Sequence, residues 1–134
     1  MQPPKIFYSI ALLIVILDQL SKYFVKNYFP YTTNTGAAFG ILQGQRTFLI
    51  FITIIILGVI FYHAKHYPIA LGFLFGGAIS NLIDRIFLGK VIDFIDLGFW
   101  PSFNIADSSN TLGVGILLFL WIQETINDAN SKKP

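Results

Sequence analysis

Cysteine is absent from this 134-residue chain, and charged residues make up only 12% of it. The lack of cysteine excludes a disulfide framework, a thiolate nucleophile and a Cys-ligated metal. Soluble domains contain about one-quarter charged residues, so the small charged fraction here indicates a surface that is largely turned away from water. The net charge of +2 is small and the basic residues are scattered, which gives a nucleic-acid partner no electrostatic support.

Apolar residues take the place of the missing charge. The chain is 54% hydrophobic and 16% aromatic. A water-soluble protein of this size lacks the interior volume to bury so many large apolar side chains. The composition therefore predicts an integral membrane protein, and the length predicts one domain covering residues 1–134.

Four apolar segments are long enough to cross a bilayer, because about 20 residues at 1.5 Å rise span its hydrocarbon core. They predict transmembrane helices at about 6–25, 47–64, 69–87 and 108–123. No small-x-small cleavage site follows the first segment, which favours a retained helix over a cleaved signal peptide. The third segment carries Gly72, Gly76 and Gly77, which predict close helix packing. Four spans place both termini on one side of the membrane.

Two of the connecting stretches differ from ordinary linkers. Residues 27–45 contain NTGAAFG, a run of small and apolar residues that predicts a short amphipathic segment at the membrane surface. Residues 89–104 combine β-branched and aromatic residues with two carboxylates. Trp100 in this second stretch suits the headgroup region, where aromatic rings collect.

The distribution of basic residues leaves the orientation in the membrane open. If the termini are cytoplasmic, that side holds Lys5, Lys65, Lys132 and Lys133, whereas Lys22, Lys26, Arg46, Arg85 and Lys90 lie on or near the other side. The positive-inside rule does not favour this topology. It requires that some of these basic residues serve a site instead of setting the orientation.

The few acidic residues are placed where structure alone does not require them. Asp18 lies within the first apolar segment, where a carboxylate costs about 2.5–3.5 kcal/mol unless it faces protein or water. Asp84, Asp93, Asp96 and Asp107 all map to one membrane face in a four-span topology. Two carboxylates that lie close together in a partly dry site do not both ionise easily, so one keeps a proton while the other acts as a base. Such a pair is able to activate water against a peptide bond.

Each of these polar residues also has a purely structural interpretation, and the sequence leaves both interpretations open. Asp107 with Ser108 is suited to cap the fourth helix, and Asp93 and Asp96 are suited to be solvated loop residues. Asp84 and Arg85 are able to form a local ion pair, and Asp18 and Lys22 a buried pair one helical turn apart. The default role of Asn34, Asn81 and Asn104 is that of turn or cap residues.

Other chemistries have less support. His63 and His66 lie three residues apart, but no HExxH motif or third ligand accompanies them, so we expect no metal and no cofactor. Ser80 and Ser108 lack a partner base on the same membrane face, which argues against serine catalysis. A membrane carrier with a proton pathway is disfavoured because the chain has no internal repeat. A non-catalytic scaffold would need only the packing glycines and the aromatic anchors.

The motifs together resemble a known family, the bacterial lipoprotein signal peptidases (signal peptidase II). The motifs are DQLSKYFV from Asp18, NTGAAFG from Asn34, GGAISNLIDR ending at Arg85, VIDFID around Asp93, and FNIADS from Phe103 to Ser108. Each motif alone is a weak signal, but five in family order within four apolar spans are very specific. The chain departs from the family pattern in a shorter segment between Asp93 and Asp107 and in a more polar continuation, Ser-Ser-Asn, after the second Asp.

The resemblance implies an intramembrane aspartic endopeptidase that cuts diacylglyceryl-modified prolipoproteins just before the lipidated Cys. The implied fold is an all-α membrane protein with four transmembrane helices, a small extracytoplasmic strand and loop subdomain, and a short amphipathic surface segment. The implied setting is the cell inner (cytoplasmic) membrane, with the active site at the extracytoplasmic face, membrane lipid and prolipoproteins as partners, and a monomeric chain. The implied site residues are the dyad Asp93 and Asp107, the substrate-binding residues Asn34, Asn81, Arg85 and Asn104, and the supporting residues Asp18, Asp84 and Ala106.

Overall fold

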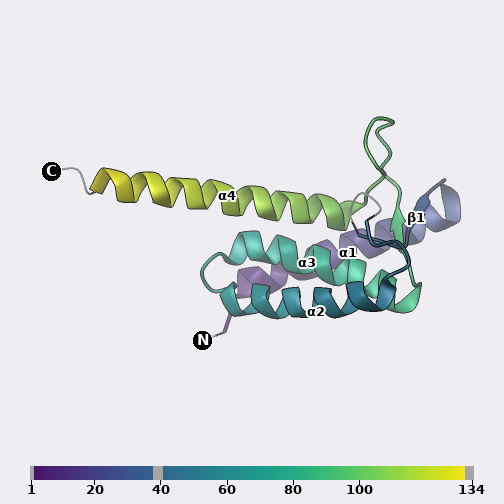
Figure 1. Cartoon of the computed structure of the whole chain (residues 1–134), viewed down its shortest axis with the longest axis horizontal. Coiled ribbons are helices and arrows are strands. Elements are labelled where there is room, and N and C mark those ends of the chain that lie inside the picture. Colours follow the sequence, from purple (N-terminus) through teal and green to yellow (C-terminus); the bar gives the residue numbers. More distant parts are fainter. Residues whose placement is uncertain (1, 38–40, 132–134) are drawn as a thin grey trace.

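A computed structural model of the chain describes residues 2–37 and 41–131 (Figure 1). Within these residues it contains four long helices and two short strands. Their bounds are Lys5–Tyr28 (α1), Thr32–Asn34 (β1), Arg46–His63 (α2), Pro68–Phe87 (α3), Val91–Asp93 (β2) and Ile105–Ser131 (α4). The predicted fold class, four helices with a small strand region, is confirmed.

Helix α3 is the centre of the bundle and packs against α1, α2 and α4 (Figure 1). Small residues on α3 permit this close contact. A Cβ atom at Gly76 would lie only 2.8 Å from the carbonyl oxygen of Ala11 on α1. A Cβ atom at Gly77 would collide with Asn110 and with the carbonyl oxygen of Ala106 on α4. The prediction that glycines in the third segment serve helix packing is therefore confirmed.

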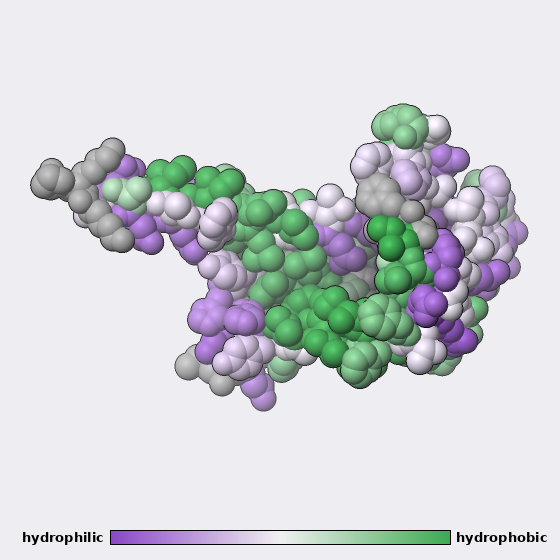
Figure 2. Space-filling view, in the orientation of Figure 1, coloured by the Kyte–Doolittle hydropathy of each residue, from purple (hydrophilic) through white to green (hydrophobic). Residues whose placement is uncertain are grey.

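The outer surface of the helices is apolar. Large side chains such as Leu12, Phe51 and Phe119 are more than half exposed. Figure 2 shows apolar residues over the middle of the helices and polar residues toward the ends. Each of the four helices is long and apolar enough to cross a membrane, and the start of α1 and the end of α4 lie on the same side of the bundle (Figure 1). The chain is a multi-pass membrane protein.

Helix α4 runs beyond the predicted span of 108–123 at both ends and projects past the other helices (Figure 1). The polar residues after the apolar run contain no proline or glycine, so the helix continues through them to Ser131. The hydroxyl of Tyr67, before α3, donates to Glu124 Oε2 at 3.0 Å and ties this part of α4 to the bundle. Helix α1 likewise passes the predicted end at residue 25 and reaches Tyr28.

The two strands lie at the end of the bundle opposite the termini (Figure 1). They pair antiparallel, with Thr32 opposite Asp93 and Asn34 opposite Val91. A bridge between Ile95 and Phe103 follows and closes an exposed loop. Of the surface segment expected at 27–45, the structure describes β1 and a turn at 41–44, while residues 38–40 lie outside the described residues.

Arg46 at the start of α2 stabilises the end of α3. Its Nε donates to the carbonyl oxygen of Arg85 and its guanidinium to that of Ile86, both at 2.7 Å. These carbonyls belong to the last turn of α3, which has no helical partner for them. A cation at this position also complements the negative end of the helix dipole. Arg46 thereby fixes the end of the helix that carries Arg85.

Candidate active site

The first turn of α4 is closed by a reciprocal pair of hydrogen bonds between Asn104 and Asp107. Asn104 Oδ1 accepts from the backbone N–H of Asp107 at 2.8 Å, and Asp107 Oδ2 accepts from the backbone N–H of Asn104 at 3.1 Å. This arrangement is a capping box built from Asn-Ile-Ala-Asp. The interpretation of Asp107 as a helix cap is therefore correct, but the cap uses only one of its two oxygens.

Asp93 ends β2 and is only 4% exposed. The side-chain amide of Asn104 donates to Asp93 Oδ1 at 2.8 Å. Asn104 is itself fully buried, so one residue joins the two carboxylates, Asp107 through its backbone and Asp93 through its side chain. Asp93 is thus not a solvated loop residue, whereas Asp96 is exposed and accepts a hydrogen bond from the backbone N–H of Gly98.

Asn81 on α3 supplies the remaining contact to Asp107. Its Nδ2 donates to Asp107 Oδ1 at 2.9 Å. Its Oδ1 accepts from Lys22 Nζ and from Asn104 Nδ2, both at 3.1 Å. These two donors fix which way the Asn81 amide is turned, so that its N–H group points at Asp107.

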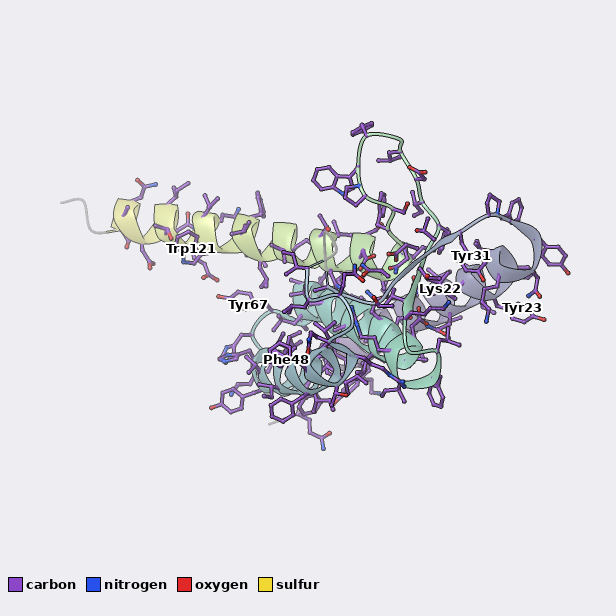
Figure 3. The ribbon with its side chains drawn as sticks, turned by 45° about the vertical axis from the view of Figure 1, so that its right-hand side comes forward. Lys22, Tyr23, Tyr31, Phe48, Tyr67 and Trp121 are labelled. Carbon is purple, nitrogen blue, oxygen red and sulfur yellow. The ribbon has the colours of Figure 1, made fainter. Side chains whose placement is uncertain are left out.

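Lys22 lies at the centre of a buried network, although it is a lysine with 2% exposure. Figure 3 shows it where the helices meet the strands. Its Nζ is 2.6 Å from Asp18 Oδ2 and 2.8 Å from Asp84 Oδ2, and Asn81 is its third acceptor. The interpretation of Asp18 and Lys22 as a buried pair is confirmed. Asp84 pairs with Lys22, not with Arg85 as the local ion-pair interpretation expected.

The two carboxylates bound to Lys22 also hold the backbone next to Asp93 and Asp107. Asp18 Oδ1 accepts from the backbone N–H of Ala106 at 2.9 Å, next to Asp107. Asp84 Oδ2 accepts from the backbone N–H of Ile92 at 3.2 Å, next to Asp93. The structure therefore places Asp18, Asp84 and Ala106, which the sequence predicted as supporting residues, next to Asp93 and Asp107.

Two residues of this network were not singled out from the sequence as part of the site. Ser80 Oγ donates to Asp18 Oδ2 at 2.7 Å, and Gln19 Nε2 donates to Asp84 Oδ1 at 2.9 Å. The sequence does contain a signal for them, because each is a polar residue inside an apolar segment next to another polar residue. Ser80 is next to Asn81, and Gln19 is next to Asp18. That signal does not say which partner each residue will meet, because the partners are more than 60 residues away.

Asp93 and Asp107 face a common cavity of about 750 Å³. The predicted residues Asn34, Asn81 and Arg85 also line it. Its remaining wall is largely apolar and comes from the loop after β2 and from α4, with Leu97, Phe99, Trp100, Phe103 and Leu112. Asn104 lies behind the two carboxylates instead of on the cavity wall.

Arg85 connects the cavity to the loop after β1. Its guanidinium donates to the carbonyl oxygen of Gly36 at 2.9 Å, while its Nε is buried without a hydrogen-bond partner among the described residues. Asn34 shapes the same loop, because its Oδ1 accepts from the backbone N–H of Gly36 at 2.8 Å and its Nδ2 donates to Ala37. A side chain at Gly36 would collide with the carbonyl oxygen of Ile41.

Burial and the neighbouring charge of Asp107 together raise the pKa of Asp93 to about 6, against the opposing effects of the Asn104 hydrogen bond and Lys22. A carboxyl group with this pKa keeps its proton in mildly acidic conditions. One buried carboxyl that holds a proton beside a second carboxyl is the arrangement that activates water. In the described residues, no group of three or more His, Cys, Asp or Glu side chains is arranged to hold a metal.

The helices, the cavity and the carboxylate pair define a membrane enzyme of the aspartic peptidase type. The family model described as signal peptidase (SPase) II matches residues 10–123. The lipoprotein signal peptidase of Shouchella clausii is 44% identical, covering 94% of this chain and 99% of the relative, and that of Halothermothrix orenii is 37% identical, covering 90% and 99%. A solved bacterial membrane enzyme matches with a TM-score of 0.86 and 36% identity, covering 95% of this chain and 91% of that structure.

The chain therefore belongs to the signal peptidase II family, and it is an aspartic peptidase. The predicted family and enzyme class are confirmed. The individual roles given to Asp93, Asp107 and the substrate-binding residues stay predictions, and the geometry above provides the arguments for them.

Proposed function

We propose that this peptidase removes the signal peptide from diacylglyceryl-modified prolipoproteins, cutting just before the lipidated Cys with Asp93 and Asp107 as its catalytic dyad. The observation that carries the proposal is the pair of carboxylates that one buried asparagine joins at the wall of a single apolar cavity. Membership of the signal peptidase II family supplies the reaction.

Asp107 acts as the base. Both of its oxygens accept hydrogen bonds, from Asn81 and from the backbone of Asn104, an arrangement that suits an ionised, acceptor-only carboxylate. It takes a proton from the water that attacks the carbonyl carbon of the residue before the lipidated Cys. Asp93 gives its proton to the leaving nitrogen as the C–N bond breaks. The products are a carboxyl group on the signal peptide and a free amino group on the Cys.

The apolar wall of the cavity explains a requirement for the lipid. Leu97, Phe99, Trp100 and Leu112 are placed beside the dyad, where the acyl chains of a membrane-held substrate would lie. The lipid holds the substrate in the bilayer and so raises its effective concentration at the cavity, and the acyl chains add van der Waals contacts with these side chains.

The dyad is proposed to face the extracytoplasmic side of the cell inner membrane. At the strand end of the bundle, Lys22, Arg46 and Arg85 are each used by an ion pair or by hydrogen bonds to backbone carbonyls. Of the basic residues at this end, only Lys26 and Lys90 then count toward the orientation in the membrane. The other end has four lysines, which lie in the terminal segments and between α2 and α3. This count supports cytoplasmic termini by the positive-inside rule.

The direct test is cleavage of a purified prolipoprotein in detergent, with and without the diacylglyceryl group, followed by mass spectrometry of the products. We expect one cut before the Cys and a kcat/KM at least about tenfold higher for the lipidated precursor, which corresponds to about 1.4 kcal/mol. Asp96→Asn is the matched control, because Asp96 is exposed and, among the described residues, its side chain accepts a hydrogen bond only from the backbone N–H of Gly98. Equal cleavage of both precursors would contradict the proposed substrate class, and absence of cleavage would overturn the proposal.

The pH profile of kcat/KM is expected to be bell-shaped with its alkaline limb near pH 6. The pKa of Asp93 is raised to about 6, so the proton that it donates is present below this pH and is lost above it. The rate then falls about tenfold per pH unit on the alkaline side, and it falls on the acidic side when Asp107 becomes protonated. Initial rates measured between pH 4 and 9 test this, and a flat profile would argue against two-carboxylate chemistry.

A further inference from the structure

Asn110 on α4 makes no side-chain hydrogen bond within the described part of the chain. It follows Asp107 by one helical turn and lines the same cavity. Its Oδ1 is buried without a partner. The neighbouring polar side chains differ in this respect, because Ser108, Ser109 and Thr111 each donate to a backbone carbonyl.

The packing of α3 against α4 fixes the direction of the Asn110 side chain. The carboxamide rests in the space that Gly77 leaves open, where a Cβ atom would lie 2.8 Å from Asn110 Cγ and closer still to Oδ1. Oδ1 therefore faces α3 and is closed off from solvent. Nδ2 branches from Cγ in the other direction and is not among the buried unpaired atoms. Nδ2 is therefore the polar atom of Asn110 that faces the cavity.

Oδ1 is held in this position although a buried polar group without a partner costs about 1–3 kcal/mol. The donor Nδ2 is not buried, has no hydrogen-bond partner among the described residues, and lies about 5 Å from Asp107 along the helix, away from the strands and toward the interior of the membrane. Carbonyl oxygens are the acceptors that the substrate has at this depth. They belong to the ester groups of its diacylglyceryl moiety and to the backbone of its signal segment, which needs donors wherever it is not helical.

We propose that Asn110 is a specificity-determining residue whose side-chain amide donates a hydrogen bond to a carbonyl oxygen of the bound substrate, on the membrane side of the dyad. The inference rests on the proposed function and adds to it a polar contact in the otherwise apolar part of the cavity. This contact is present in the bound substrate and in the transition state alike, so it acts on KM.

Asn110→Leu separates this role from a structural one. Leucine also branches at Cγ and therefore fits beside Gly77, but it removes the donor together with the unpaired buried oxygen. We expect KM for the lipidated precursor to rise about three- to tenfold, the factor for one net hydrogen bond, with kcat nearly unchanged. The midpoint of thermal unfolding is expected to stay the same or rise, because the buried unpaired oxygen is gone.

Asn127→Leu is the matched control. It is the same substitution on α4 at an exposed position that does not line the cavity, so KM should not change. An unchanged KM in Asn110→Leu, or a lower unfolding midpoint with unchanged kinetics, would overturn the inference and leave the proposed function standing. Failure of the wild type to cleave would overturn both.

A precursor analogue with ether links in place of the two esters identifies the source of the carbonyl. If the ester groups accept the bond, wild type and Asn110→Leu will have the same KM for the ether analogue. If the peptide backbone accepts it, the difference in KM will persist with the analogue. In both cases the acceptor is a carbonyl oxygen of the substrate. The comparison is made only after Asn110→Leu has raised KM for the ester substrate.

Discussion

Asp107→Asn is expected to lower kcat for prolipoprotein cleavage by about 10³-fold or more, because the substitution removes the base that takes the proton from water. The change is nearly isosteric. An asparagine at this position keeps its backbone N–H bond to Asn104 Oδ1 and is able to keep one oxygen toward Asn81. Its amide group then meets the backbone N–H of Asn104, which weakens one half of the capping box and costs about 1 kcal/mol.

Asp93→Asn is expected to have a similar effect on the rate with a different effect on stability. Asparagine retains the oxygen that accepts from Asn104 but has no proton to give to the leaving nitrogen. Because the pKa of Asp93 is raised to about 6 by burial, its unfolded carboxyl ionises at lower pH than its folded one, so a stability penalty builds up between about pH 4 and 6 and is complete above pH 6. A neutral side chain removes this penalty, so Asp93→Asn should unfold at a higher temperature than wild type at pH 8, with a smaller difference at pH 5 that disappears below about pH 4.

Asp96→Asn again provides the matched control for both variants. It is the same chemical change at an exposed carboxylate three residues after Asp93. Rates within about twofold of wild type in this control, with loss of cleavage in the two dyad variants, would establish the dyad by initial-rate measurements. Wild-type rates in Asp107→Asn or in Asp93→Asn would remove the two-carboxylate mechanism.

The sequence predicted the four helices well, because length and apolar composition are local properties. It was less accurate at the start of α4, expected at residue 108 and observed at Ile105. The apolar run begins late, but Asn104 and Asp107 satisfy each other's backbone N–H groups and start the helix earlier. A motif that resembled a catalytic signature was therefore also the signal of a helix boundary.

The sequence indicated which residues to consider for the candidate site, but it did not predict the contacts among them. Asp18 was paired with Lys22 from helical spacing alone, since residues i and i+4 share a face. The contact of Asp18 with the backbone of Ala106 joins positions 88 residues apart and depends on how closely α1, α3 and α4 approach. Asn104 was expected to contact substrate, and its position behind both carboxylates follows from the pairing of β2 with the start of α4, which no local pattern contains.

Lys22→Met is expected to destabilise the folded protein by about 3–5 kcal/mol, the cost of leaving buried charges without their partner. The Nζ of Lys22 is the only cation within 4 Å of the Asp18 and Asp84 carboxylates among the described residues. Both carboxylates are 2% exposed or less, so water does not replace the lost cation. Thermal unfolding in detergent measures the loss. Lys26→Met, one turn further along α1 at an exposed position, should leave the unfolding midpoint unchanged.

The triple variant Lys22→Met, Asp18→Asn, Asp84→Asn removes all three charges together. Each asparagine is able to keep one oxygen for the backbone N–H of Ala106 or Ile92, so most of the lost stability should return. Activity should not return with it. Without Lys22, the Asn81 oxygen loses the donor that helps to turn its N–H group toward Asp107, and cleavage should stay at least about tenfold below wild type. Recovery of stability and activity together would limit Lys22 to a structural role, whereas recovery of stability alone would make it a positioning residue for the dyad.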